Sequence, residues 1–212
     1  MLLKNPKGQF QPNGVRRIAG VDEAGRGPWA GPVVAAAVIL RTAPLPVRVD
    51  DSKRLTSAQR DRAFGAILRH AEVGFGIASV DEIDRMNILQ ATLLAMRRAL
   101  LDLPTPAEAA VIDGPFIPDV PMPCQPIVHG DRLNYAISCA SIVAKVFRDR
   151  LMAFYHDLAP AYGFRQHKGY GTALHAERLT AFGPSVFHRA SFEPVRRSLL
   201  AIPHEALVLA ET

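Results

Sequence analysis

The sequence predicts an α/β fold in which helices pack on a mixed β-sheet. Short apolar runs bounded by Gly and Pro are typical of buried strands, and two Ser/Thr-x-x-Glu/Gln capping boxes mark helix starts. The first three predicted strands lie close together in the sequence, whereas the later ones alternate with helices, an order typical of a mixed sheet. With 212 residues, 49% of them hydrophobic, the chain can bury one sizeable core.

The strands are predicted from continuous or alternating apolar segments. We expect them at Ile18–Val21, Val33–Leu40, Glu72–Val80, Ala109–Ile112 and Pro126–Val128. The second of these is apolar throughout, which favours a strand that is buried on both faces.

The helices are predicted from their start signals. "TSAQ" at Thr56–Gln59 opens a helix that runs to about His70, and "SVDE" at Ser79–Glu82 opens one that runs to about Leu101. A third and longer helix is expected over Asn134–Leu158, followed from Gly163 by loops and short helices.

Composition limits the classes of partner. The chain carries a formal charge of +5, and residues 131–197 hold 10 basic but only 5 acidic side chains, so we expect a polyanionic partner. No apolar run reaches about 18 residues and no signal peptide is apparent, which predicts a cytoplasmic protein without membrane association. Cys124 and Cys139 lack metal-site or disulfide spacing and are expected to be small packing residues.

Carboxylates stand at the ends of three predicted strands. Asp22 and Glu23 end the "GVDE" segment, and Asp113 and Asp131 end "VIDG" and "HGD". Clustered, half-buried carboxylates repel one another, and a hard divalent cation such as Mg²⁺ removes that penalty. Each acid alone could instead form a turn or cap a helix.

The adjacent pair raises a geometric problem. Neighbouring residues on a strand point to opposite faces, so Asp22 and Glu23 serve one site only if the strand ends there or if Glu23 reaches around its edge.

Cations and glycines recur in segments suited to phosphate. Gly25 and Gly27 flank Arg26, and Ser52 and Lys53 precede a helix start. "HKGYGT" carries Lys168 and Tyr170, a ring that could stack on a base or sugar, and "HRASF" at His188–Phe192 repeats the cation–aromatic theme. For the long-helix cations Lys145, Arg148 and Arg150, the default expectation is a solvated face.

Taken together, these motifs resemble bacterial ribonuclease HII. The resemblance rests on "GVDEAGRGPWAGPVVAAAV", "DSKRL", "NILQAT", "IDGP", "GDRLNYAISCASIVAKVFRD", "HKGYGT" and "HRASF", in unbroken order from Ile18 to Val195. It implies a ribonuclease-H-like fold with a mixed five-stranded sheet, a catalytic domain over 15–160, and a C-terminal helical extension over 161–200 that contributes to nucleic-acid binding.

The resemblance also implies an activity and a site. The family cleaves RNA in RNA–DNA hybrids and cuts 5′ of single ribonucleotides in duplex DNA, leaving 3′-hydroxyl and 5′-phosphate ends, with two Mg²⁺ or Mn²⁺ ions. Its four acids correspond to Asp22, Glu23, Asp113 and Asp131. Its ribose-sensing turn, phosphate contacts and junction-sensing tyrosine correspond to Gly25, Arg26, Gly27, Ser52, Lys53 and Tyr170, and we add Lys145 and Lys168 as candidate substrate contacts.

Three residues depart from the usual family pattern. Trp29 stands where leucine is common, His129 where lysine is common, and Cys139 where alanine is usual. None is one of the four acids.

Two other functions remain open from the residues alone. A junction resolvase of the same fold type would share the acids and ignore ribose, and a non-catalytic nucleic-acid-binding module would explain the basic C-terminal third. We expect a monomer, and the tail Ile202–Thr212 lacks the pair of aromatics that would suggest docking to a sliding clamp.

Overall fold

The computed structural model describes residues 3–4, 10–11 and 17–200, and its centre is a five-stranded mixed sheet. The sheet contains β3 (Ile18–Ala24), β4 (Val33–Leu40), β5 (Ala71–Ala78), β6 (Ala109–Asp113) and β7 (Cys124–Ile127) in the order β5-β4-β3-β6-β7. β4 pairs antiparallel with β3 and β5, whereas β6 pairs parallel with β3 and β7, which confirms the predicted mixed sheet. β1 (Leu3–Lys4) and β2 (Phe10–Gln11) form a separate antiparallel pair. The expectations for residues 15–16 and for Ile202–Thr212 fall outside the described residues.

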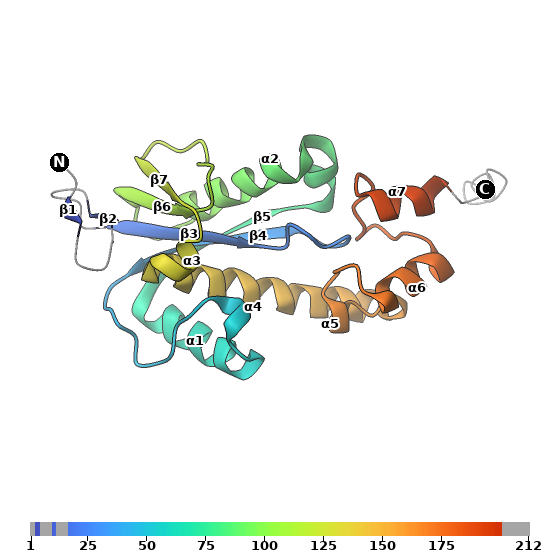
Figure 1. Ribbon diagram of the computed structural model, residues 1–212, viewed down its shortest axis with the longest axis horizontal. Coiled ribbons are helices and arrows are strands. Elements are labelled where there is room, and N and C mark those ends of the chain that lie inside the picture. Colours follow the sequence, from blue (N-terminus) through green and yellow to red (C-terminus); the bar gives the residue numbers. More distant parts are fainter. Residues whose placement is uncertain (1–2, 5–9, 12–16, 201–212) are drawn as a thin grey trace.

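Helices cover both faces of the sheet (Figure 1). They are α1 (Ser57–His70), α2 (Val80–Leu101), α3 (Gly130–Leu133), α4 (Tyr135–Leu158), α5 (Phe164–His167), α6 (Ala173–Phe182) and α7 (Glu193–Leu200), with 3₁₀ turns at Ser52–Arg54 and Pro160–Tyr162. α2 lies on one face, α4 with α1 on the other, and α5, α6 and α7 lie beyond one end of the sheet. Within residues 17–200, no helix combines the length and apolar character needed to cross a membrane.

Both predicted capping boxes are present. The Thr56 hydroxyl accepts the Gln59 N–H, and the Gln59 side chain accepts the Thr56 N–H in return; Ser79 and Glu82 do the same at the start of α2. The predicted second helix is present over Val80–Leu101, but it is kinked at Asn87, whose φ of 73° is not helical. The Asn87 Oδ1 accepts hydrogen bonds from the backbone N–H groups of Leu89 and Gln90, so Asn87 caps the second part of α2.

The centre of the sheet is buried on both faces. On β4, Ala35 and Ala37 pack in the cluster formed with α2, whereas Ala36 and Val38 pack in the cluster formed with α4. On β3, a Cβ at Gly20 would lie 2.3 Å from the Ala136 carbonyl carbon, so only glycine allows α4 this close. This contact brings α4 against the strand that carries the acidic pair.

β3 runs further than predicted, because it continues through Asp22 and Glu23 to Ala24. Its ladder with β4 extends to Ala24↔Val34, but its ladder with β6 ends at Val21↔Ile112. The β3 edge beside the acidic pair is therefore not paired with β6. Two arrangements were expected to let both acids serve one site. The strand does not end at the pair, so the structure excludes the first arrangement. The second arrangement, in which the Glu23 side chain reaches around the unpaired strand edge, is the one that remains.

Candidate active site

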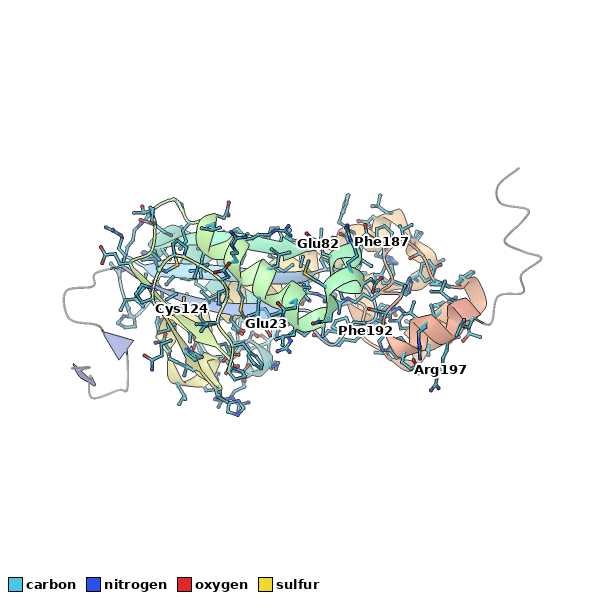
Figure 2. All side chains as sticks on the ribbon, turned by 90° about the horizontal axis from the view of Figure 1, so that it is seen from above. Glu23, Glu82, Cys124, Phe187, Phe192 and Arg197 are labelled. Carbon is cyan, nitrogen blue, oxygen red and sulfur yellow. The ribbon has the colours of Figure 1, made fainter. Side chains whose placement is uncertain are left out.

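Three carboxylates converge where β3 leaves its ladder with β6. One oxygen from each of Asp22, Glu23 and Asp113 lies within 4.8 Å of the other two. Figure 2 shows Glu23 near the middle of the molecule. Asp22 is 5% exposed, and its Oδ1 accepts the Glu23 N–H at 2.7 Å. Asp113 accepts the Gly130 N–H at 2.6 Å, which ties the end of β6 to the start of α3.

Burial and mutual repulsion act strongly on this cluster. Burial raises the pKa of Asp22 well above its ordinary value, and the charges of Glu23 and Asp113 raise it further. The pKa of Glu23 is also raised, first by burial, while the nearby Arg26 guanidinium opposes the rise. The Arg26 Nη1 lies 3.7 Å from Glu23 Oε1. The cluster therefore carries repulsion that its own hydrogen bonds do not remove.

Asp131 lies next to this cluster on α3, and the structure decides against its alternative role as the cap of the long helix. Asn134 caps α4, because its side chain accepts the Ala136 and Ile137 amides at 2.9 and 3.2 Å. Burial and the charge of Asp113 raise the pKa of Asp131. Its carboxylate is thus available to a ligand beside the other three acids.

These acids line one cavity of about 340 Å³ together with most of the predicted substrate contacts. The lining includes Asp22, Glu23, Gly25, Arg26, Gly27, Ser52, Lys53, Asp113, Asp131, Lys145 and Tyr170, with Ala24 and Ser141 in addition. Lys168 is absent from the lining; its Nζ instead donates to the Arg165 carbonyl at 2.5 Å. The structure thus brings together all the predicted site residues except Lys168.

The cations and hydroxyls of the cavity are held by neighbours. Ser52 Oγ lies 3.0 Å from Ser141 Oγ on α4, a buried contact that the sequence analysis missed. The Lys53 N–H binds Asp51 Oδ1, which fixes the turn before α1. Lys145 Nζ binds Asp149 at 2.7 Å and lies 5.8 Å from the centre of the Tyr170 ring.

A buried arginine holds the glycine-rich turn from behind. Arg189 has no exposed surface and donates to the carbonyls of Gly25, Arg26, Pro28 and Gly31 at 2.6 to 3.0 Å. Burial lowers the pKa of Arg189 to about 9, so the guanidinium stays charged at neutral pH. The sequence motif "HRASF" suggested a nucleic-acid contact for this cation; that interpretation is wrong, because the side chain is fully buried and each of its three nitrogens donates to the turn's backbone.

Arg148 is a second correction. The default expectation of a solvated face is wrong for this residue, which is fully buried and donates to the carbonyls of Ala30, Pro32 and Lys168 at 3.0 to 3.1 Å. It joins the end of the turn to the loop that carries Tyr170. Arg150, by contrast, pairs with Asp61 at 3.0 Å on the exposed surface, as expected for a solvated helix face.

Gly25 shows why the turn needs glycine. Its φ of +104° is a conformation that other residues rarely adopt, and a Cβ there would lie 2.1 Å from Arg148 Nε. The carbonyls of Gly25 and Arg26 face Arg189. Because N–H and C=O of one trans peptide point in opposite directions, the N–H groups of Arg26 and Gly27 point away from Arg189.

The donor set fits a divalent cation. Oxygen ligands from several carboxylates are what Mg²⁺ and Mn²⁺ prefer, and one oxygen from each of Asp22, Glu23 and Asp113 lies within 4.8 Å of the other two. Lys53 and Lys145 also line the cavity, but Lys145 is paired with Asp149. Asp22, Glu23, Asp113 and Asp131 are therefore suited to hold metal.

The three departures from the family pattern leave the acids untouched. Trp29 packs beside His175 with ring centres 5.3 Å apart, and His129 precedes α3 with a φ of 57°. Cys139 is fully buried in the core, where burial raises its pKa to about 12, and Cys124 is half-buried. Both thiols therefore act as packing residues, as predicted.

Comparison with known proteins places the chain in a family. The family model described as Ribonuclease HII matches residues 19–195. The Ribonuclease HII of Rhodospirillum rubrum is 52% identical over 92% of this chain and 94% of its own, and that of Geobacter sulfurreducens is 53% identical over 88% and 86%.

A solved structure supports the fold. The crystal structure of ribonuclease H2 from Pyrococcus horikoshii OT3 superimposes with a TM-score of 0.70 over 86% of this chain and 97% of that one, at 24% identity. The predicted ribonuclease-H-like fold is thereby confirmed. The chain belongs to the ribonuclease HII family, the type 2 ribonucleases H, which are metal-dependent endoribonucleases acting on RNA–DNA hybrids.

Proposed function

We propose that this endonuclease also cuts 5′ of single ribonucleotides embedded in duplex DNA, leaving 3′-hydroxyl and 5′-phosphate ends, and that it uses two divalent ions, Mg²⁺ or Mn²⁺. The observation that carries the proposal is the glycine-rich turn. Its carbonyls are bound by Arg189, so the N–H groups of Arg26 and Gly27 point away from Arg189, and all three residues of the turn line the cavity with the acids. A pair of amides beside a metal-binding cluster suits a 2′-hydroxyl next to the scissile phosphate.

Each group of the cavity then has a role. Asp22, Glu23, Asp113 and Asp131 would hold the metal, which would supply a lowered pKa of bound water and stabilisation of the charge on the leaving 3′-oxygen. The amides of Arg26 and Gly27 orient the ribose. The remaining polar groups bind the flanking phosphates; they are Ser52, Lys53 and Lys145.

Lys168 has a weaker case than the other candidate contacts. Its Nζ is bound to Arg165, and its pKa is lowered, first by burial. Its carbonyl, bound by Arg148, fixes the Tyr170 loop, so we assign the residue to the loop's shape. Residues 161–200, the predicted extension for nucleic-acid binding, supply Tyr170 and Arg189, which supports that role. A monomeric state and a cytoplasmic location stay predictions.

The test uses three duplexes of one sequence: all DNA, DNA with one ribonucleotide, and a long RNA–DNA hybrid. Each is incubated with Mg²⁺, with Mn²⁺ and with a chelator, and the ends are mapped. We expect one nick 5′ of the ribonucleotide, only with metal, and no nick in all-DNA duplex. Cleavage of the hybrid without cleavage at the single ribonucleotide would contradict the proposal. Cleavage of an all-DNA four-way junction would favour the resolvase.

Asp131→Asn should raise the metal concentration needed for half-maximal activity by about tenfold, because one charged oxygen ligand is lost from the cluster. Thermal stability should stay within about 0.5 kcal/mol of wild type, because α4 is capped by Asn134. Activity is titrated with Mg²⁺, and unfolding is followed by circular dichroism. A large loss of stability with an unchanged metal requirement would restore the structural role of this acid.

Tyr170→Ala should slow cleavage at a single ribonucleotide by about ten- to a hundredfold, which corresponds to ~1–3 kcal/mol of lost stacking. The ring is 41% exposed at the cavity. On our proposal it stacks on the deoxyribose next to the ribonucleotide, so the loss in a long hybrid should be smaller. Tyr170→Phe should keep most of the rate.

Phe154→Ala provides the matched control, because this ring is 54% exposed on α4 and does not line the cavity. It should leave both rates unchanged. Equal, small losses for Tyr170→Ala on both substrates would make the tyrosine a packing residue.

A further inference from the structure

Three histidines form a buried cluster below the Tyr170 loop that the proposed mechanism does not use. His167, His175 and His188 are at most 7% exposed. The rings of His167 and His175 stack with centres 4.2 Å apart, and the Nε2 atoms of His175 and His188 lie 3.0 Å apart. Such a cluster is costly to bury unless every ring nitrogen has a partner.

The partners fix which nitrogen carries each proton. The Ser185 N–H donates to His188 Nδ1 at 3.0 Å, so that nitrogen is an acceptor and the proton of His188 is on Nε2. His175 Nδ1 lies 2.9 Å from the Tyr170 carbonyl, which can only accept, so the proton of His175 is on Nδ1. His188 Nε2–H then donates to His175 Nε2.

The result is a directed chain of hydrogen bonds. It runs from the Ser185 amide through His188 and His175 to the Tyr170 carbonyl. Burial lowers the pKa of both histidines to about 4, so both are neutral at pH 7, as the chain requires.

His167 completes the support of the loop. Its Nδ1 accepts the Gly169 N–H at 3.1 Å, its Nε2 donates to the Tyr162 carbonyl at 2.7 Å, and its own carbonyl accepts the Tyr170 N–H at 2.9 Å. Both backbone groups of Tyr170 are therefore bound here: the N–H donates to the His167 backbone carbonyl, and the carbonyl accepts from His175 Nδ1–H and from the Thr172 N–H.

The neighbouring carbonyls of the loop are bound as well. Arg148 binds that of Lys168 at 3.0 Å, and the Trp29 N–H binds that of Gly169 at 2.8 Å. Trp29 follows the glycine-rich turn and packs beside His175. The backbone of the tyrosine loop is therefore fixed relative to that turn, while its phenol ring stays exposed at the cavity.

We infer that His175 and His188 are positioning residues for Tyr170, and that their directed hydrogen bonds set the direction in which its ring meets the substrate. The inference rests on the proposed substrate contact of Tyr170. The role depends on hydrogen-bond direction as well as on packing, because a protonated or flipped imidazole in this chain would place two donors or two acceptors against each other.

The chain predicts a pattern that a packing role does not. The amide nitrogen of asparagine can take the place of Nδ1, and that of glutamine the place of Nε2. At position 175 the donor to Tyr170 is Nδ1, so His175→Asn should stay within about threefold of wild type and His175→Gln should lose about tenfold at a single ribonucleotide. At position 188 the order should reverse, with His188→Gln retaining more activity than His188→Asn. His70→Asn and His70→Gln, at the end of α1, are the matched controls.

The closing experiment has two parts. Cleavage rates are measured for the histidine variants alone and together with Tyr170→Ala, and the ¹⁵N NMR spectrum of the imidazoles is recorded for the wild-type protein at pH 7. We expect the His175→Gln loss to vanish in the Tyr170→Ala background. We also expect neutral rings with the proton on Nδ1 of His175 and on Nε2 of His188. Because the NMR measurement uses the wild-type protein, it does not depend on whether any variant folds.

The outcomes separate the two proposals. If Tyr170→Ala is impaired while His175→Gln is not, or if NMR finds the opposite tautomers, the positioning role is overturned and the proposed function stands. If Tyr170→Ala is unimpaired, the proposed substrate contact fails, and the positioning role fails with it.

Discussion

Asp22→Asn should reduce the cleavage rate by about 10³-fold or more while leaving the protein folded. Asp22 is the most buried of the four acids, it is repelled by Glu23 and Asp113, and its oxygen lies within 4.8 Å of theirs. On the proposed function, losing its charge removes a central metal ligand, and effects of this size are typical of metal-centred and electrostatic catalysis. The measurement is single-turnover cleavage of the one-ribonucleotide duplex under saturating Mg²⁺.

The fold should tolerate this change or gain from it. Asparagine keeps the Oδ1 that accepts the Glu23 N–H, and it removes one of the repelling charges. Wild type should melt at a higher temperature when Mn²⁺ is added, because a ligand that binds the native state stabilises it, whereas the variant should respond less. This second measurement does not depend on activity.

Asp61→Asn is the matched control, because Asp61 is an exposed acid on α1 that is paired with Arg150 of α4. It should change neither the rate nor the response to metal. Activity of Asp22→Asn within tenfold of wild type would show that Asp22 is not a metal ligand.

Arg189→Lys should slow cleavage at a single ribonucleotide by about a hundredfold and destabilise the protein by about 3 kcal/mol. The guanidinium spans four carbonyls of the turn, and a lysine ammonium cannot do so from a single nitrogen. Buried carbonyls that lose their partner account for the stability loss. A shift of about 1 Å in the turn is enough to cost two orders of magnitude in rate.

Two measurements check this prediction: urea unfolding and the cleavage rate under conditions where the variant is folded. Arg197→Lys is the control, because Arg197 lies on α7, is 77% exposed at its side chain and pairs only with Glu193 among the described residues (Figure 2). Full activity of folded Arg189→Lys would mean that the glycine-rich turn keeps its shape without the hydrogen bonds of the guanidinium.

The sequence predicted the parts of the fold that depend on local chemistry. The capping boxes at Thr56 and Ser79 and the apolar run of β4 were placed within a residue or two, because caps and burial leave direct patterns. The kink at Asn87 was missed, since one polar residue in an apolar pattern does not reveal a positive φ.

The residues that line the cavity were easier to predict from the sequence than the buried residues that hold them in place. Residues that face the cavity belong to motifs whose chemistry is recognisable, such as the acid pair and Tyr170. The buried fork of Arg189 and the imidazole chain were not predicted, because a single sequence does not show whether a cation or a histidine is buried. The partners of Arg189 are backbone carbonyls up to 164 positions away.

The place of Arg189 in the chain also orders the events of biosynthesis. All four acids and the cap of α4 have been synthesised by residue 134, but Arg189, which holds the glycine-rich turn, follows more than fifty residues later. On the proposed function, a chain that ends before Arg189 would carry all four acids but lack the group that holds the turn proposed to contact ribose. The selectivity for ribose that we propose would therefore depend on a residue that is made late in synthesis.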